Sequence, residues 1–130
     1  MTETAPKTSK ATTPLGDQIL VLVADDDADM RLYIRGCLRS RGDIRIVEAT
    51  DGDEAFALAQ TLLPDLIVSD LVMPGLDGAA LCRALKADGR TREIPFLLVS
   101  GEAQASCADR FLAKPFNAAG LRAEVAHLVT

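Results

Sequence analysis

The sequence predicts a doubly wound α/β fold, in which helices cover both faces of a parallel β-sheet. Two short apolar runs, residues 19–24 and 66–69, end abruptly in acidic residues, which is typical of strands buried on both faces of such a sheet. Segments with apolar residues at spacings of three and four alternate with apolar runs of this kind. The 130 residues, 48% of them hydrophobic, provide one core and leave no room for a second domain.

Strands and helices are expected to alternate along the chain. The expected strands are short apolar runs at residues 19–24, 44–49, 66–69, 96–99 and 111–113. The expected helices carry one apolar stripe each and cover about residues 28–40, 53–62, 79–87 and 118–128. Right-handed crossovers between such segments place helices on both faces of an open parallel sheet.

Residues with special backbone preferences mark the ends of these elements. Gly42 stands where a glycine is expected to end a helix, and Asp51 and Asn117 are expected to cap helix N-termini. Pro64 and Pro95 each precede a strand, where the missing N–H costs little.

Composition bounds the organisation of the chain. Residues 1–16 are rich in Thr, Ser, Lys, Ala and Pro, so we expect a disordered N-terminal arm followed by one domain over residues 17–130. No apolar stretch is long enough to span a membrane and no signal pattern precedes the domain, so we expect a cytoplasmic location and no membrane partner.

Charge and rare residues exclude several classes of function. The net charge of -5 argues against nucleic-acid binding, and we interpret Arg31, Arg35 and Arg39, which have helical spacing, as a solvated helix face. The three cysteines have no CxxC spacing, which argues against a zinc site or a disulfide framework. The single histidine, close to the C-terminus, argues against a Ser-His-Asp triad.

Acidic residues gather at the ends of two expected strands. Asp25, Asp26 and Asp27 follow the first strand, and Asp70 follows another. Because the carboxyl ends of parallel strands meet at one edge of a sheet, we expect these four carboxylates to lie together. Their mutual repulsion in a half-buried cleft predicts a bound Mg²⁺. An N-cap for the following helix is the alternative interpretation of the three consecutive aspartates.

Two further strands end in residues with complementary chemistry, Ser100 and Lys114. A carboxylate beside a cation, a hydroxyl and an ammonium is the arrangement of a phosphoryl-acceptor site. Asp70 would attack phosphorus, the cation and Lys114 would neutralise the equatorial oxygens, and Ser100 would donate a hydrogen bond.

Five motifs in order resemble the receiver domain of two-component response regulators over about residues 18–129. They are VLVADDDADMR, IVSDLVMPGLDG, LLVSGE, FLAKPF and the closing helix. The resemblance implies a five-stranded, flavodoxin-like sheet with the strand order 2-1-3-4-5. Because the chain ends at Thr130, directly after the last helix, we expect a stand-alone receiver domain without an output domain.

The resemblance also implies roles for individual residues. Asp70 would be the phosphorylated nucleophile, and Asp26 and Asp70 would bind Mg²⁺ directly. Asp25 would hold a metal-bound water, and the backbone carbonyl of Val72 would be another ligand. No other cofactor is expected.

A second set of implied roles concerns the response to phosphorylation. Ser100 would be the switch hydroxyl, and Lys114 would pair with the phosphate from a cis Lys114-Pro115 peptide bond. Phe111 occupies the aromatic switch position of the family, and an ordinary core position is the alternative interpretation of this residue.

The implied phosphodonor is a sensor histidine kinase or a histidine phosphotransfer protein, and the implied output is contact with a downstream protein target that the sequence does not identify. The chain would catalyse only its own phosphorylation and dephosphorylation.

One alternative function is a small Mg²⁺-dependent phosphatase of the haloacid-dehalogenase type. Another is a phosphorylation-dead scaffold, which would have a damaged acidic pair, nucleophile or lysine, and none of these is damaged here.

The chain departs from the family pattern at two places. Only residues 101–110 separate Ser100 from Phe111, so we expect the fourth helix to be short or missing. The apolar surface uncovered in this way would be buried by a partner protein, by a second copy in a homodimer, or by a rearranged final helix. Val72 has no polar group to orient an attacking water, which predicts slow self-dephosphorylation.

Overall fold

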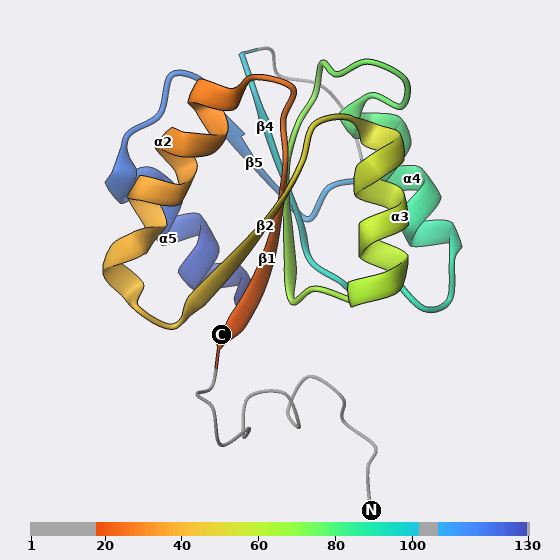
Figure 1. Ribbon diagram of the computed structural model, residues 1–130, viewed down its shortest axis with the longest axis horizontal. Helices are drawn as coiled ribbons and strands as arrows, with labels where there is room; N and C mark the ends of the chain where they lie inside the picture. The colour runs from red at the N-terminus through yellow and green to blue at the C-terminus, as the bar shows by residue number, and fades with distance from the viewer. Residues whose placement is uncertain (1–17, 102–106, 130) are drawn as a thin grey trace, which may run out of the picture.

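The computed structural model describes residues 18–101 and 107–129, which form one sheet between two pairs of helices (Figure 1). The strands are β1 (Ile19–Ala24), β2 (Ile44–Ala49), β3 (Leu66–Asp70), β4 (Phe96–Ser100) and β5 (Arg110–Ala113). The helices are α2 (Ala28–Leu38), the 3₁₀ helix η1 (Arg39–Arg41), α3 (Gly52–Leu62), α4 (Gly78–Ala87) and α5 (Ala118–Val129).

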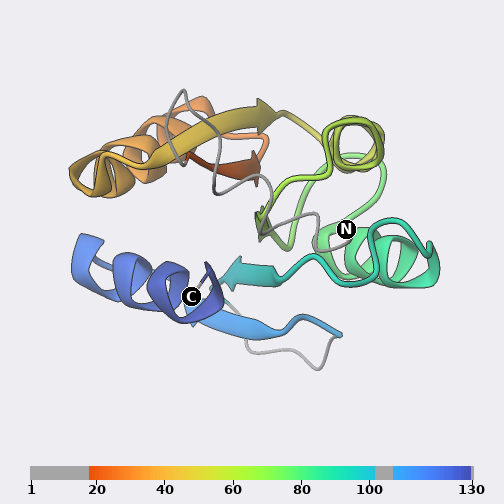
Figure 2. The same cartoon turned by 90° about the horizontal axis from the view of Figure 1, so that it is seen from below.

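All neighbouring strands pair in parallel, and their order is β2-β1-β3-β4-β5. Helices α2 and α5 cover one face and α3 and α4 cover the other. Seen from below, the sheet runs between the two helix pairs (Figure 2). The predicted fold class and strand order are therefore confirmed.

Each face of the sheet has its own apolar core, because successive strand side chains point to opposite faces. On β1, Val21 and Val23 belong to the core under α2 and α5, while Leu22 and Ala24 belong to the core under α3 and α4. Burial of one large aliphatic side chain contributes roughly 1.5–3 kcal/mol. The last five residues of β1 are all buried, so this strand brings the acidic residues that follow it to a fixed place.

The predicted end signals are found in the structure. Asp51 accepts a hydrogen bond from the Glu54 N–H at 2.7 Å, and Asn117 accepts one from the Gly120 N–H at 2.8 Å. Gly42 follows η1 with a φ of 77°, a left-handed conformation that glycine adopts without steric cost. These local signals were readable because each depends on neighbouring residues only.

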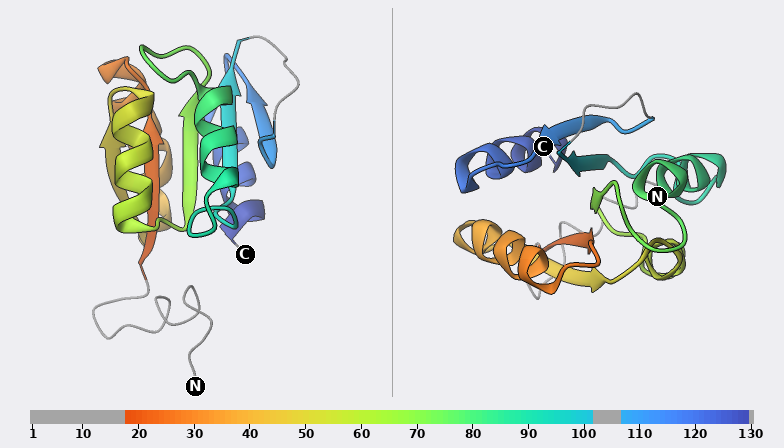
Figure 3. Two further views of the ribbon diagram at one scale, coloured as in Figure 1. Left: turned by 90° about the vertical axis from the view of Figure 1, so that its right-hand side faces the viewer. Right: turned by 90° about the horizontal axis from the view of Figure 1, so that it is seen from above.

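The connection from β4 to β5 has no assigned helix at residues 101 and 107–109. The predicted short or missing helix is the one between β4 and β5, not α4. That prediction also falls on residues 102–106, which lie outside the described residues, as does the predicted arm at residues 1–16. In the left view of Figure 3, α3 and α4 lie in front of the sheet, and β5 forms the outer edge of the sheet next to β4. The end of the connection is attached to α4, since Lys86 Nζ lies 2.9 Å from Asp109 Oδ2.

The three cysteines are free thiols. Cys37 and Cys82 are buried in helices, whereas Cys107 is exposed. Among the described residues, no helix has the length and apolar character needed to cross a membrane.

Candidate functional site

The acidic residues that follow β1 and end β3 form one cluster. Asp25, Asp26 and Asp70 each offer a carboxylate oxygen, and these atoms all lie within 4.8 Å of one another. Asp25 is only 3% exposed, and the Asp70 side chain is 12% exposed, whereas Asp26 is an exposed residue. A ligand would therefore approach the cluster from the side of Asp26.

Asp27 caps a helix and is not a member of this cluster. Its Oδ1 accepts a hydrogen bond from the Asp29 N–H at 2.9 Å at the start of α2. The expectation that all four carboxylates gather is thus wrong for Asp27. The physical reason is that the first N–H groups of a helix have no partner within the helix, and the Asp27 carboxylate supplies one.

Lys114 reaches the cluster from the loop after β5. Its Nζ lies 3.0 Å from Asp70 Oδ1 and 4.0 Å from Asp25 Oδ2. Asp70 Oδ1 also accepts a hydrogen bond from the Leu71 N–H at 2.9 Å. The Lys114-Pro115 peptide bond is cis. The fold therefore brings together two charged groups that are 44 residues apart in the sequence.

Ser100 ends β4 next to Lys114. The Lys114 N–H donates a hydrogen bond to the Ser100 carbonyl at 2.8 Å, which ties the ends of β4 and β5 together. Ser100 is 3% exposed. The predicted hydroxyl, ammonium and carboxylate thus all lie at the carboxyl edge of the sheet: Asp70 and Ser100 end β3 and β4, and Lys114 directly follows β5.

Phe111 lies in register with Leu98, and Ala113 lies in register with Ser100. Because residues two apart on a strand face the same way, Phe111 and Ser100 lie on the same face of the sheet. Phe111 is 38% exposed, which differs from an ordinary core position. Val72 follows Asp70 by two residues in the loop between β3 and α4, and it is 71% exposed.

The electrostatics of the cluster favour a cation. Burial raises the pKa of Asp25, and the negative charges of Asp70 and Asp26 raise it further. The hydrogen bond from the Asp27 N–H and the charge of the Lys114 ammonium lower the pKa of Asp25, but the net shift remains upward. A divalent cation would reverse this balance, since it favours the ionised carboxylates. Carboxylate oxygens are also the ligands that Mg²⁺ prefers, so the residues present fit this ion.

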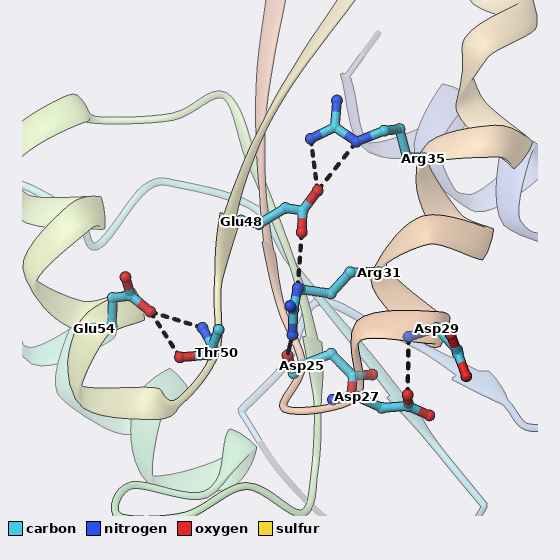
Figure 4. A network of polar contacts seen from close by, with 8 residues as sticks. All are labelled: Asp25, Asp27, Asp29, Arg31, Arg35, Glu48, Thr50 and Glu54. Atoms are coloured by element: carbon cyan, nitrogen blue, oxygen red, sulfur yellow. Dashed lines mark hydrogen bonds and ion pairs between the residues drawn. The ribbon is translucent and has the colours of Figure 1, made fainter.

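A charged network behind the acidic loop was missed by the sequence analysis (Figure 4). Arg31 Nη1 donates a hydrogen bond to the Asp25 carbonyl at 2.7 Å, and Arg31 Nε lies 2.7 Å from Glu48 Oε1. The interpretation of a solvated helix face is wrong for Arg31, whose side chain is only 14% exposed. The available signal was Glu48, a charged residue near the end of an otherwise mostly apolar strand.

The fold and this site define a doubly wound α/β domain that carries acidic, hydroxyl and ammonium groups at one edge of its sheet. The family model of the response regulator receiver domain matches residues 21–126. The chain belongs to this family.

Two curated relatives illustrate how the family uses such domains. The chain is 33% identical over 113 residues to the chemotaxis protein CheY of Pseudomonas aeruginosa, which covers 81% of this chain and 91% of that protein. It is 34% identical over 117 residues to histidine kinase P4 of Formosa agariphila, which covers 84% of this chain. The match spans only 8% of the kinase, so this chain corresponds to a small part of that relative.

A solved structure shares the fold closely. The receiver domain of the sensor histidine kinase PA1611 from Pseudomonas aeruginosa superimposes with a TM-score of 0.80 at 27% identity, covering 86% of this chain and 98% of that one. That structure has a magnesium ion coordinated in its active site cleft. This chain is a receiver domain of two-component signalling, and the comparisons do not support the phosphatase alternative.

Proposed function

We propose that the domain accepts a phosphoryl group on Asp70 from a phosphohistidine of a sensor histidine kinase or a histidine phosphotransfer protein. The observation that carries this proposal is the contact between Lys114 Nζ and Asp70 Oδ1 at 3.0 Å beside the acidic cluster. A cation next to the reacting carboxylate lowers the cost of bringing an anionic phosphoryl group to it.

The chemistry assigns one task to each side chain. A carboxylate oxygen of Asp70 forms a bond to phosphorus, and the bond between phosphorus and the donor imidazole nitrogen breaks with the electron pair remaining on nitrogen. The Lys114 ammonium pairs with the phosphoryl oxygens, and the Ser100 hydroxyl donates a hydrogen bond to one of them. The product is an acyl phosphate on Asp70.

The proposed Mg²⁺ ligands are the carboxylates of Asp26 and Asp70 and the backbone carbonyl of Val72, with Asp25 in support. When bound, the ion supplies positive charge to the phosphoryl oxygens. Two observations support this set: the carboxylate oxygens of the three aspartates gather within 4.8 Å, and the related PA1611 domain holds magnesium in its cleft.

Phosphorylation is proposed to change a protein-binding surface on the β4–β5 side. It adds roughly two negative charges and three acceptor oxygens at Asp70, which draw Ser100 inward. Phe111, on the same face of the sheet and 38% exposed, then rotates toward the space that Ser100 leaves. Equal NMR shifts for the Phe111 ring in the free protein and in a complex with a phosphoryl mimic would remove this residue from the mechanism.

The output of the switch is proposed to be contact with a downstream protein or with a second copy of the domain. Residues 17–130 are proposed to form the receiver domain, with residues 1–16 as an N-terminal arm. Catalysis is limited to the domain's own phosphorylation and dephosphorylation. A monomer in sedimentation at high concentration, with and without the phosphoryl group, would exclude the dimer.

The central test uses intact mass after incubation with Mg²⁺ and a small acyl phosphate. A stable adduct is expected in the unmodified chain and none in Asp70→Ala. Asp27→Asn is the matched control, because it removes a neighbouring charge outside the cluster and keeps a side-chain oxygen for the helix cap. Released phosphate over many turnovers would indicate a phosphatase, and the absence of any adduct would indicate a scaffold.

A further inference from the structure

We propose that Arg31 and Glu48 are positioning residues that hold the Asp25-Asp26 loop in the geometry that binds Mg²⁺. This inference rests on the proposed function, since it concerns the same metal site. Neither side chain belongs to the acidic cluster itself.

The N–H, the carbonyl and the side chain of Asp25 each have a hydrogen-bond partner. Its N–H donates to the Ala49 carbonyl at 3.1 Å, and its carbonyl accepts from Arg31 Nη1 at 2.7 Å. Its side-chain Oδ1 accepts from the Asp27 N–H at 2.9 Å. The two peptide groups that flank Asp26 therefore each have a fixed partner: Arg31 binds the one before it, and Asp25 binds the one after it.

This backbone anchoring matters most for Asp26. Asp26 is exposed, so packing does little to set the direction of its side chain. The direction of its Cα–Cβ bond follows from the two flanking peptide planes, and Arg31 fixes the first of them. Repulsion from Asp25 and Asp70 would otherwise favour an outward position of the Asp26 carboxylate in the absence of a cation.

Arg31 is itself held in place by Glu48, which stands on β2 in register with Val23 of β1. Arg31 Nε lies 2.7 Å from Glu48 Oε1, so the guanidinium uses one side for Glu48 and another for the Asp25 carbonyl. The hydrogen bonds from Arg35 and Arg31 lower the pKa of Glu48, so this anchor stays ionised into more acidic solution than an ordinary glutamate does. The guanidinium thus connects β2, α2 and the loop after β1 (Figure 4).

The network acts by geometry more than by charge. The Glu48 carboxylate pairs with both Arg31 and Arg35, so the network keeps a net positive charge, which by itself opposes a bound cation. Any support that Arg31 gives to Mg²⁺ binding therefore comes from the position in which it holds the loop. Residues that orient metal ligands without touching the metal commonly change metal affinity by about 10- to 100-fold when they are replaced.

The chain offers a matched control in Arg35. Arg35 lies on the same helix as Arg31, and its side chain is 41% exposed. Arg35 Nη2 lies 2.6 Å from Glu48 Oε2. Among the described residues, the side-chain hydrogen bonds of Arg35 go to Glu48, whereas those of Arg31 also reach the Asp25 carbonyl. Arg31→Met and Arg35→Met each remove one positive charge and one guanidinium partner of Glu48, and only Arg31→Met also removes the hydrogen bond to the loop.

The experiment measures the Mg²⁺ dissociation constant of the full chain by titration calorimetry, together with thermal unfolding with and without Mg²⁺. Arg31→Met is expected to weaken Mg²⁺ binding by about 10-fold or more and to shrink the increase in Tm that Mg²⁺ produces. Arg35→Met is expected to change the dissociation constant by less than about 3-fold. Arg31→Lys keeps the charge but lacks the fork that reaches both partners, so it is expected to remain weakened.

Each outcome decides the inference. If the unmodified chain binds Mg²⁺ and Arg31→Met binds it equally well, the inference is overturned while the proposed function stands, even where Tm falls. If the unmodified chain binds no Mg²⁺, both fail together. Should Arg31→Met not fold, Glu48→Gln takes its place, because it keeps the shape of the side chain and weakens the anchor. A dissociation constant for Glu48→Gln equal to that of the unmodified chain would then overturn the inference.

Discussion

The two sides of the site are built differently. On the acidic side, Asp25 follows a strand whose last five residues are all buried, and its N–H, carbonyl and carboxylate each have a hydrogen-bond partner. On the opposite side, β5 has four residues and three of them are exposed, Phe111 among them. The side that would hold the ion is thus fixed by packing, and the side that would respond to the phosphoryl group has fewer contacts to break.

The boundary between these two regions runs between β4 and β5. All five residues of β4 are buried, including Ser100 at its end, while its neighbour β5 has no buried residue. Segments with few buried contacts open at low free-energy cost, so local change is expected first at β5. Substitutions in the acidic cluster, on β4 and on β5 should therefore have different effects on stability and on Mg²⁺ binding.

The same substitution on the two neighbouring strands gives the sharpest comparison. Phe96→Ala on β4 removes a ring that is 1% exposed and is expected to lower the free energy of unfolding by about 3–5 kcal/mol. Phe111→Ala on β5, where the ring is 38% exposed, is expected to cost only about 1 kcal/mol. Urea unfolding of both variants measures the difference. Equal losses would break the contrast between the strands.

Mg²⁺ binding separates the two sides of the site in a second way. Asp26→Ala removes a proposed direct ligand and is expected to raise the Mg²⁺ dissociation constant by about 100-fold or more. Ser100→Ala is expected to leave that constant within about 3-fold, since a neutral hydroxyl contributes little to a carboxylate site. Titration calorimetry on both variants provides the measurement. A large loss in Ser100→Ala would mean that the metal site extends across the whole edge of the sheet.

The pH dependence of stability tests how strained the acidic side is without metal. The pKa of Asp25 is raised above 3.8 in the folded state, so ionised Asp25 costs stability at neutral pH, and this cost disappears as pH falls below 3.8. Asp25→Asn is therefore expected to be more stable than the unmodified chain at pH 7 without metal, with a gain that shrinks toward acidic pH. Urea unfolding in a chelator across this pH range checks the sign. A gain that grows on acidification would contradict the raised pKa.

The smallest effect is expected on the exposed strand. Arg110 Nε lies 2.7 Å from Glu124 Oε1, but its side chain is 44% exposed and solvent screens the pair. Arg110→Ala is expected to leave Tm almost unchanged. A large decrease in Tm would show that this ion pair, rather than apolar packing, attaches β5 to α5.

The strand-end chemistry could be predicted because it follows from a simple rule. Apolar runs that end in Asp, Ser or Lys place those residues at one edge of a parallel sheet, and the approach of Lys114 to Asp70 agrees with that rule. The role of Asp27 could not be separated from that of Asp26, since both follow the same strand. Which carboxylate turns toward the helix depends on the backbone turn after Ala24.

The Arg31 network could not be predicted for a different reason. Arg31 and Glu48 are 17 residues apart, and their contact depends on how α2 packs against β2. Helical spacing alone gave Arg31, Arg35 and Arg39 the same interpretation. Only the packing separates a side chain that is 14% exposed from one that is 41% exposed.

The hydrogen bond from the Lys114 N–H to the Ser100 carbonyl has a consequence for how a signal would leave the site. Ser100 and Lys114, the two residues proposed to bind the phosphoryl oxygens, share this main-chain hydrogen bond. We therefore expect them to move together rather than independently. A displacement of either residue would therefore move the end of the outermost strand as well. A protein that docks along that edge would then respond to the state of the aspartate through this link in addition to Phe111.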